Sequence, residues 1–323
     1  MRIAVAGSIA TDNLMTFPGK FADQFVAGQL DQISLSFLVD ELEIRWGGAA
    51  ANIAYGLGIL GMRPLLVGAA GTDFDEYRSW LDQHGVVTDY VQVSKTRKTA
   101  RFTVTTDAVQ NQIASFYAGA MSEASDIDLG DIAQQAGGLD LVLVGADNPE
   151  AMVKHSARAR DLGITFIADP SQQCARMDGP EIRQLLDGAT YLMTNEYEKA
   201  LIEEKTGWAD ADILDRVGTR VTTLGAKGVR IDRKGDPSLH VPAVAAGKVG
   251  DPTGSGDAFR GGFITALAWD LPLERAAQLG NAVAVHALEV VGPQDYQIDS
   301  GALLDRFAAT YGDTAADDVR PHL

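Results

Sequence analysis

The chain has 323 residues, of which 46% are hydrophobic and 22% charged, so its length allows one large globular domain or two ordinary ones. Its 44 acidic residues outnumber the 27 basic ones and give a net charge of -17, which argues against nucleic acid as the main partner because phosphate backbones require a basic surface. A single cysteine, Cys174, excludes an intramolecular disulfide and a multi-cysteine zinc site. No run of about 18 apolar residues occurs, so we expect no membrane partner and a cytoplasmic protein.

Short apolar runs recur along the chain, and each ends at Gly, Asp, Asn or Thr before a helix-like stretch. They lie at residues 3–6, 65–67, 139–144, 164–168, 191–193 and 221–224. Runs that are apolar on both faces and separated by helices are typical of parallel strands in a doubly wound α/β sheet. We therefore predict a mainly parallel sheet flanked by helices, in a large domain made of residues 1–10, 48–98 and 118–323. Ligand sites of such sheets lie beyond the carboxyl ends of the strands.

Two segments, residues 11–47 and 99–117, break this rhythm because polar and apolar residues alternate in them. Alternation predicts half-buried antiparallel strands, one of them running through Ser36 and Phe37. We interpret the two segments as a small β-sheet inserted into the large domain as a lid over its site. Unpaired strand edges and apolar lid faces tend to be covered, so we also expect a homodimer formed through the lid.

The last third of the chain is predicted to be helical. Residues 258–268 and 273–291 carry small and apolar side chains at helical spacing. The tail beyond Leu304 is polar and acidic, and we expect it to fray.

The sequence Asp251-Pro252-Thr253-Gly254-Ser255-Gly256-Asp257 directly precedes the first of these helices. Free N–H groups at a helix N-terminus bind anions, and glycines let the backbone approach the ligand. If the anion is a phosphoryl group in transfer, the Asp257 carboxylate beside it can take the proton of an attacking hydroxyl group. The alternative is a glycine turn and a capped helix with no ligand.

A second glycine motif, Gly56-Leu57-Gly58-Ile59-Leu60-Gly61, matches the pattern G-x-G-x-x-G. A dinucleotide site needs this motif after a strand and before a helix, but here residues 49–60 are themselves helix-like. We interpret the glycines as close helix packing followed by a helix end. The chain contains neither a P-loop motif nor a G-x-S-x-G nucleophile motif.

A third cluster combines Gly47-Gly48 at the start of a predicted helix, Asn52 within it, and Ser8 and Asp12 after the first predicted strand. A carboxylate and an amide that converge on one spot suit a vicinal diol. Asn52 alone is equally compatible with a structural amide.

Taken together, these motifs resemble those of the ribokinase/PfkB carbohydrate kinase family. Four motifs carry the resemblance in the family's order: Gly47-Gly48 with Asn52, Asn195-Glu196-Tyr197-Glu198, Thr223-Leu224-Gly225-Ala226-Lys227-Gly228, and residues 251–257. The last departs from the family pattern at Pro252 and Ser255.

The resemblance implies a role for each matching residue. It makes Asp257 the catalytic base and the backbone of Gly254, Ser255 and Gly256 the anion hole. It makes Asn195 and Glu198 the pair that positions Mg²⁺ and phosphate. It assigns Asn195, Thr223, Gly225 and Gly228 to ATP, and Asp12, Gly48 and Asn52 to sugar hydroxyl groups. It also implies K⁺ near residues 251–257.

The choice of substrate depends on the predicted lid and on residues 169–176. Phe102 and Phe116 lie on two arms of one predicted hairpin and can stack on a purine, although they can equally be lid core. Ser8 and Ser36 can bond base nitrogens. Gln172 and Gln173 can read an adenine edge, and Arg176 can neutralise a phosphate or be a solvated helix residue.

This pattern resembles bacterial adenosine kinases of the same family, with matches at Ser8, Asp12, Ser36, Phe102, Phe116, Gln172 and Gln173. It implies ATP-dependent phosphorylation of the 5′-hydroxyl group of adenosine, giving AMP and ADP in purine salvage. The alternatives are a kinase of a free sugar or another nucleoside, and a catalytically silent nucleoside sensor.

Overall fold

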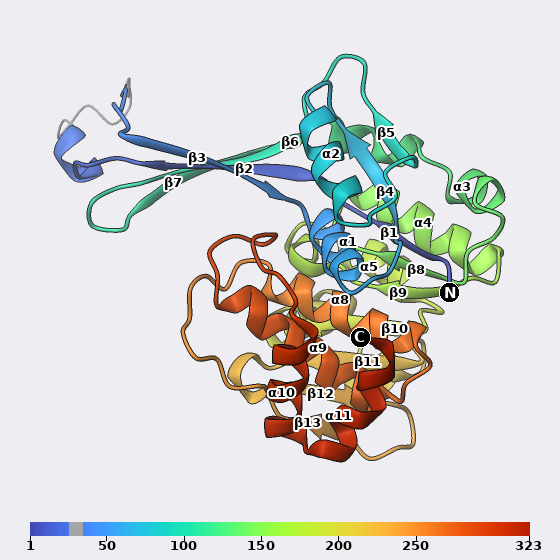
Figure 1. Cartoon of the computed structure of the whole chain (residues 1–323). Coiled ribbons are helices and arrows are strands. Elements are labelled where there is room, and N and C mark those ends of the chain that lie inside the picture. The colour runs from blue at the N-terminus through green and yellow to red at the C-terminus, as the bar shows by residue number, and fades with distance from the viewer. Residues whose placement is uncertain (26–34) are drawn as a thin grey trace.

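The computed structural model describes residues 1–25 and 35–323 (Figure 1). Part of the first predicted lid segment, residues 26–34, lies outside the described residues. The large sheet has the order β13-β12-β11-β10-β9-β8-β1-β4-β5. Its strands are β1 (Ile3–Ala6), β4 (Leu65–Ala70), β5 (Val91–Val93), β8 (Leu141–Val144), β9 (Thr165–Ala168), β10 (Tyr191–Asn195), β11 (Thr219–Thr223), β12 (Val229–Asp232) and β13 (Leu239–Val241).

The sheet is mainly parallel, as predicted. β1 pairs in parallel with β4 on one side and with β8 on the other, and parallel pairing continues through β9, β10 and β11. Only β12 and β13 at one edge are antiparallel. Because the chain order reverses between β1 and β8, a crevice is expected beyond the carboxyl ends of these two strands.

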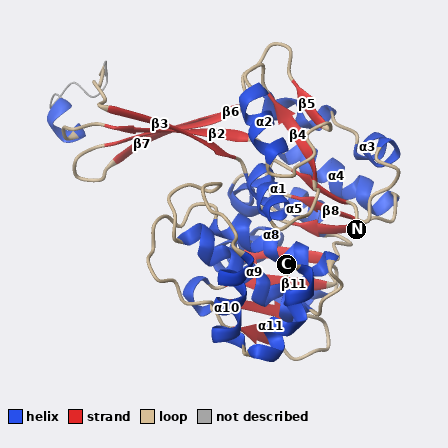
Figure 2. Cartoon of the chain, viewed as in Figure 1, coloured by secondary structure: helices blue, strands red, loops and turns tan. Residues whose placement is uncertain are grey.

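Helices cover both faces of this sheet (Figure 2). In β1, Ile3 and Val5 contribute to one hydrophobic core, whereas Ala4 and Ala6 contribute to the other. On the first face lie α1 (Ala49–Ile59), α2 (Asp75–Gln83), α8 (Ser255–Ala268), α9 (Leu273–Leu288), α10 (Ser300–Tyr311) and α11 (Asp313–Val319). On the second lie α3 (Leu129–Gln135), α4 (Pro149–Asp161), α5 (Gly179–Leu186), α6 (Glu196–Thr206) and α7 (Asp210–Leu214). None of the described helices is both long and apolar enough to cross a membrane.

A second sheet, the lid, projects from the body as a long ribbon (Figure 1). It has the order β3-β2-β6-β7 and consists of β2 (Ala10–Thr16), β3 (Glu41–Gly47), β6 (Ala100–Thr106) and β7 (Gln112–Tyr117). The prediction of antiparallel strands is wrong for the central pair, because β2 and β6 run parallel. Both strands start at the body, with Ala10 beside Ala100, and run outward from it. The division of the chain into two domains remains our interpretation.

The predicted strand through Ser36 and Phe37 is absent from the described residues. β3 begins only at Glu41. Phe37 instead packs against Phe17 and Phe21, with ring centroids 5.1 and 4.9 Å apart. Packing of this half-buried ring in an aromatic cluster replaces regular alternation before β3.

Strand register separates the two faces of the lid. Asp12 pairs with Phe102, and Phe102 pairs with Phe116, so these three side chains share one face. Asn13 pairs with Ile44, which places Ile44 on the opposite face. Leu42, Ile113 and Tyr117 share that second face.

The glycines of the G-x-G-x-x-G match serve helix packing, as predicted. Gly56 and Gly58 lie inside α1. A Cβ atom on Gly58 would lie 2.0 Å from the carbonyl oxygen of His84, and one on Gly261 of α8 would lie 3.1 Å from the backbone of Gly56. Glycine therefore lets α1 approach both neighbours closely.

The predicted fraying of the tail is wrong. Residues beyond Leu304 continue α10 and form α11, in which Phe307, Ala316 and Val319 are fully buried. The acidic residues mask this apolar stripe when only composition is considered.

Candidate active site

A cleft of about 860 Å³ lies where β1, β8, β9 and β10 end and the lid begins. It gathers most of the residues that the sequence singled out: Ser8, Asp12, Gly48, Asn52, Phe102, Phe116, Gln172, Gln173, Arg176, Asn195, Glu198, Thr223, Gly225, Gly254, Ser255, Gly256 and Asp257.

Two predicted residues do not line this cleft. Ser36 lies in the segment before β3, and its contact with a ligand remains a prediction. Gly228 has φ +92°, and a Cβ atom there would lie 2.0 Å from the carbonyl oxygen of Val241. Close packing against β13 thus explains why this position is a glycine. The contact of Gly228 with a nucleotide also remains a prediction.

The glycine-rich loop leads directly into the start of α8. Gly254 is the N-cap residue, with φ +77°, and a Cβ atom there would lie 2.4 Å from Pro293. Ser255 and Ala258 donate their N–H groups to the carbonyl oxygens of Pro252 and Gly254. The N–H groups of Gly256 and Asp257 find no acceptor within residues 1–25 and 35–323, so they are free for an anion.

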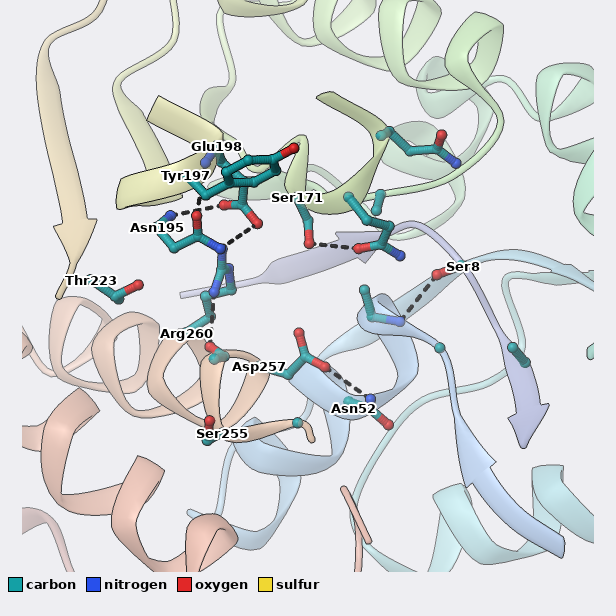
Figure 3. A pocket seen from close by; sticks show the side chains of 18 of the residues that line it. Ser8, Asn52, Ser171, Asn195, Tyr197, Glu198, Thr223, Ser255, Asp257 and Arg260 are labelled. Carbon is teal, nitrogen blue, oxygen red and sulfur yellow. Dashed lines mark hydrogen bonds between the residues drawn. The ribbon is translucent and has the colours of Figure 1, made fainter. Parts of the chain in front are cut away.

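Asp257 lies in the first turn of α8 and points toward Asn52 of α1 (Figure 3). Asn52 donates from Nδ2 to Asp257 Oδ2 over 2.9 Å. No donor from the described part of the chain reaches Oδ1, which leaves that oxygen for a substrate hydroxyl group. Burial raises the pKa of Asp257 to about 7, and Arg260 limits this rise. A carboxylate with such a pKa can act as a general base near neutral pH.

A second wall of the cleft is built where β1 leads into the lid. The Ser8 hydroxyl accepts the N–H group of Ala49 over 3.0 Å and so caps the start of α1. Gly48 has φ +94°, and a Cβ atom there would lie 2.6 Å from the backbone of Ser8 and of Ala10. Burial raises the pKa of Asp12 to about 6, with Arg45 opposing the shift. Asp12 is thus an acceptor for hydroxyl groups at neutral pH.

Asn195 and Glu198 form a capping box at the start of α6. Asn195 donates from Nδ2 to Glu198 Oε1 over 2.9 Å, and the N–H group of Glu198 donates to Asn195 Oδ1 over 2.8 Å (Figure 3). Burial raises the pKa of Glu198, and Arg260 opposes this. The helix cap holds two oxygen-bearing side chains at the cleft wall.

The lid contributes an aromatic pair. Phe102 and Phe116 face each other across β6 and β7 on the same face as Asp12. Phe116 is 47% exposed, so its ring is open to the cleft. Such a pair offers two flat apolar surfaces to a ligand.

The short 3₁₀ helix Ser171–Ala175 carries the polar residues that follow β9. The Ser171 hydroxyl donates to Gln172 Oε1 over 2.6 Å, which leaves the amide N–H₂ group of Gln172 for other partners. Gln173 is buried, and its Oε1 has no partner among the described residues. A buried unpaired oxygen in a cleft wall is expected where a ligand supplies the donor.

Four polar residues line the cleft although no role was predicted for them: Ser171, Glu196, Tyr197 and Arg260. Arg260 is buried, donates from Nη2 to Asp169 Oδ1 over 2.6 Å, and donates from Nη1 to the carbonyl oxygen of Gly256 over 3.0 Å. It lies three residues after Asp257, and this helical spacing was a usable signal. Tyr197 lies inside the Asn195-to-Glu198 motif but is 69% exposed.

Known proteins resemble this chain over most of its length. The pfkB family carbohydrate kinase model matches residues 22–299. The nucleoside kinase of Methanothermobacter thermautotrophicus is 31% identical over 271 residues, which are 82% of this chain and 85% of that protein. The nucleoside kinase of Burkholderia thailandensis, solved in complex with inosine, is 35% identical with a TM-score of 0.83, and the match covers 96% of this chain and 98% of that one.

The nucleoside kinase of Methanocaldococcus jannaschii, also solved, is 25% identical with a TM-score of 0.84 over 96% of this chain and 99% of that one. The motifs, the mainly parallel sheet with its lid, and these matches agree. The chain therefore belongs to the pfkB family of carbohydrate kinases.

Proposed function

We propose that the protein transfers the γ-phosphoryl group of ATP to the 5′-hydroxyl group of adenosine. The observation that carries this proposal is the position of Asp257, whose free Oδ1 lies beside the unpaired N–H groups at the start of α8. In the reaction the 5′-oxygen forms a bond to the γ-phosphorus while the bond to the β–γ bridging oxygen breaks. Asp257 takes the hydroxyl proton, ADP leaves, and AMP is formed.

The relatives support a nucleoside as the acceptor. One of them was solved with inosine, so another nucleoside is the first alternative to adenosine, and a free sugar is the second. The aromatic pair of the lid favours a substrate with a flat base over a free sugar. Glutamine amides offer both a donor and an acceptor, which suits an adenine edge.

The oxygen atoms of Asn195 and Glu198 fit Mg²⁺. This ion prefers hard oxygen ligands and keeps several waters, so one or two side chains suffice when phosphate oxygens complete the shell. When bound, Mg²⁺ would neutralise charge on the transferred phosphate. The K⁺ near Asp251 remains a prediction; the Asp251 carboxylate receives the N–H group of Thr253 over 2.9 Å and lies 3.7 Å from Arg45.

The proposal predicts the outcome of a substrate panel with ATP and Mg²⁺. We expect the highest kcat/KM with adenosine, a lower value with inosine, and little turnover of ribose or fructose 6-phosphate. A preference for inosine would replace adenosine but keep the class of nucleoside kinase. Turnover of ribose without turnover of any nucleoside would contradict the proposal.

The pH profile tests the role of Asp257. Because its pKa is raised to about 7, the base is protonated below this pH, and kcat/KM should fall about tenfold per unit as the pH drops further. Asp257→Asn should lower kcat by roughly 10²–10⁴-fold, the range for loss of a general base. The exposed Asp305→Asn on α10 is the matched control and should leave the profile unchanged. Normal turnover by Asp257→Asn would remove Asp257 from the mechanism.

Stacking by the lid rings predicts a specific kinetic effect. Phe102→Ala and Phe116→Ala should each raise KM for adenosine by about 5- to 160-fold, corresponding to the ~1–3 kcal/mol of a base–aromatic stack. KM for ATP should stay the same. Phe37→Ala, in the aromatic cluster at the lid tip, should lower the melting temperature but leave KM for adenosine unchanged. Lower stability with unchanged KM in the first two variants would identify their rings as lid core.

We also propose that the second face of the lid forms a homodimer. Leu42 and Ile44 of β3 are 58% and 59% exposed on this face, and Ile113 and Tyr117 of β7, at the other edge of the sheet, are 46% and 51% exposed. Large apolar side chains exposed along both edges of one face favour association. Sedimentation should give twice the chain mass of 34.3 kDa, and Leu42→Asp combined with Ile44→Asp should halve it. A wild-type mass near 34.3 kDa would refute the dimer.

A further inference from the structure

The loop between α9 and α10 sends one glutamine side chain toward the catalytic base. Gln294 is 3% exposed and donates from Nε2 to Asn52 Oδ1 over 2.9 Å and to the Tyr77 hydroxyl oxygen over 2.6 Å. Its Oε1 accepts the indole N–H group of Trp80 over 3.0 Å. With the bond from Asn52 to Asp257, these contacts form a continuous hydrogen-bond chain from α2 to the first turn of α8.

At two ends of this hydrogen-bond chain, only one direction of donation is possible. The indole N–H group of Trp80 can only donate, so Gln294 must turn its carbonyl oxygen toward it. The Tyr77 hydroxyl donates to the carbonyl oxygen of Gly47 over 2.9 Å, and a carbonyl oxygen can only accept. The Tyr77 oxygen must therefore accept a hydrogen bond from Gln294. Both constraints give the Gln294 amide the same orientation.

The fixed orientation of Gln294 determines the orientation of Asn52. Since the Gln294 N–H₂ group faces Asn52, Asn52 must present its oxygen to Gln294 and its N–H₂ group to Asp257. The reversed Asn52 amide would place a carbonyl oxygen against the Asp257 carboxylate and two N–H₂ groups against each other. In a buried site such unmatched polar contacts are costly.

We propose that Gln294, anchored by Trp80 and Tyr77, is a positioning residue that holds Asn52 as a hydrogen-bond donor to the catalytic carboxylate. Gln294 is not among the described residues that line the cleft. Its catalytic consequence rests on the proposed function, because it acts through Asp257.

A double-mutant cycle tests this coupling in the full-length protein. Gln294→Met should lower kcat about 10- to 100-fold, which is the loss of one hydrogen bond to a charged group, and should leave KM for ATP unchanged. In an Asn52→Ala background, Gln294→Met should cost less than about threefold, because no amide is left to orient. The matched control is Gln297→Met, since this glutamine in the same loop bonds the Tyr55 hydroxyl group over 3.2 Å and does not bond Asn52 or Asp257. Equal losses for Gln294→Met with and without Asn52 would overturn the proposal.

The two anchors give a second kinetic readout. Trp80→Phe and Tyr77→Phe should each cost less than about threefold in kcat, because the remaining anchor still orients Gln294. The double variant should lose as much as Gln294→Met. Additive losses would show that the anchors act only through stability, which melting temperatures would report in parallel.

A titration that needs no turnover separates this inference from the proposed function. If Gln294→Met no longer holds the Asn52 N–H₂ group as a donor to Asp257, the carboxyl ¹³C resonance of Asp257 should titrate at higher pH in this variant. The comparison is with the wild type and with Gln297→Met. The charged and titratable groups facing Asp257 are Arg260, Asp169, Glu198, Tyr77 and Tyr296, and all are retained in these variants. An unshifted titration would overturn the inference, even if the enzyme is a nucleoside kinase. A shifted titration in an enzyme without nucleoside kinase activity would support the inference and reject only the proposed function.

Discussion

The hydrogen bond from Asn52 to Asp257 joins the first turns of two helices, and the geometry of the cleft depends on it. Asn52 lies near the start of α1 and Asp257 near the start of α8, so two helix N-termini point into one cavity. Both can stabilise negative charge, which matters in a chain with a net charge of -17. Glycines that resembled a nucleotide motif make this meeting possible, because Gly56 and Gly261 bring the two helices into backbone contact.

One buried cation balances the carboxylates around this bond. Arg260 is hydrogen-bonded to Asp169 and acts electrostatically on both Glu198 and Asp257. Burial alone would raise the pKa of Asp257 further and leave the base protonated at neutral pH. The ion pair between Arg260 and Asp169 also connects α8 with the residues that precede Gln172 and Gln173. One side chain therefore connects the start of α8 with the segment that carries Gln172 and Gln173.

The sequence was most informative where one local rule dominates. Buried parallel strands give continuous apolar runs, so β1 was predicted with its observed bounds. The glycine loop was predicted to precede a helix, and α8 starts within it at Ser255; the binding of an anion there remains a prediction. Long-range contacts were not predictable in the same way. The parallel pairing of β2 with β6 joins residues 90 positions apart, the half-buried Phe37 packs against Phe17 and Phe21, and the contact of Gln294 with Asn52 spans 242 positions. No local pattern encodes such partners.

The central claim is that Asp257 deprotonates a substrate hydroxyl group beside a phosphate held by the start of α8. A crystal structure with adenosine and a non-hydrolysable ATP analogue tests this claim most directly. The account predicts the 5′-oxygen of adenosine about 2.6–3.2 Å from Asp257 Oδ1, the hydrogen-bond reach of a general base, with γ-phosphate oxygens on the N–H groups of Gly256 and Asp257. A structure in which the nucleoside occupies the cleft with its 5′-oxygen directed away from Asp257, or in which the phosphates bind elsewhere, would contradict it.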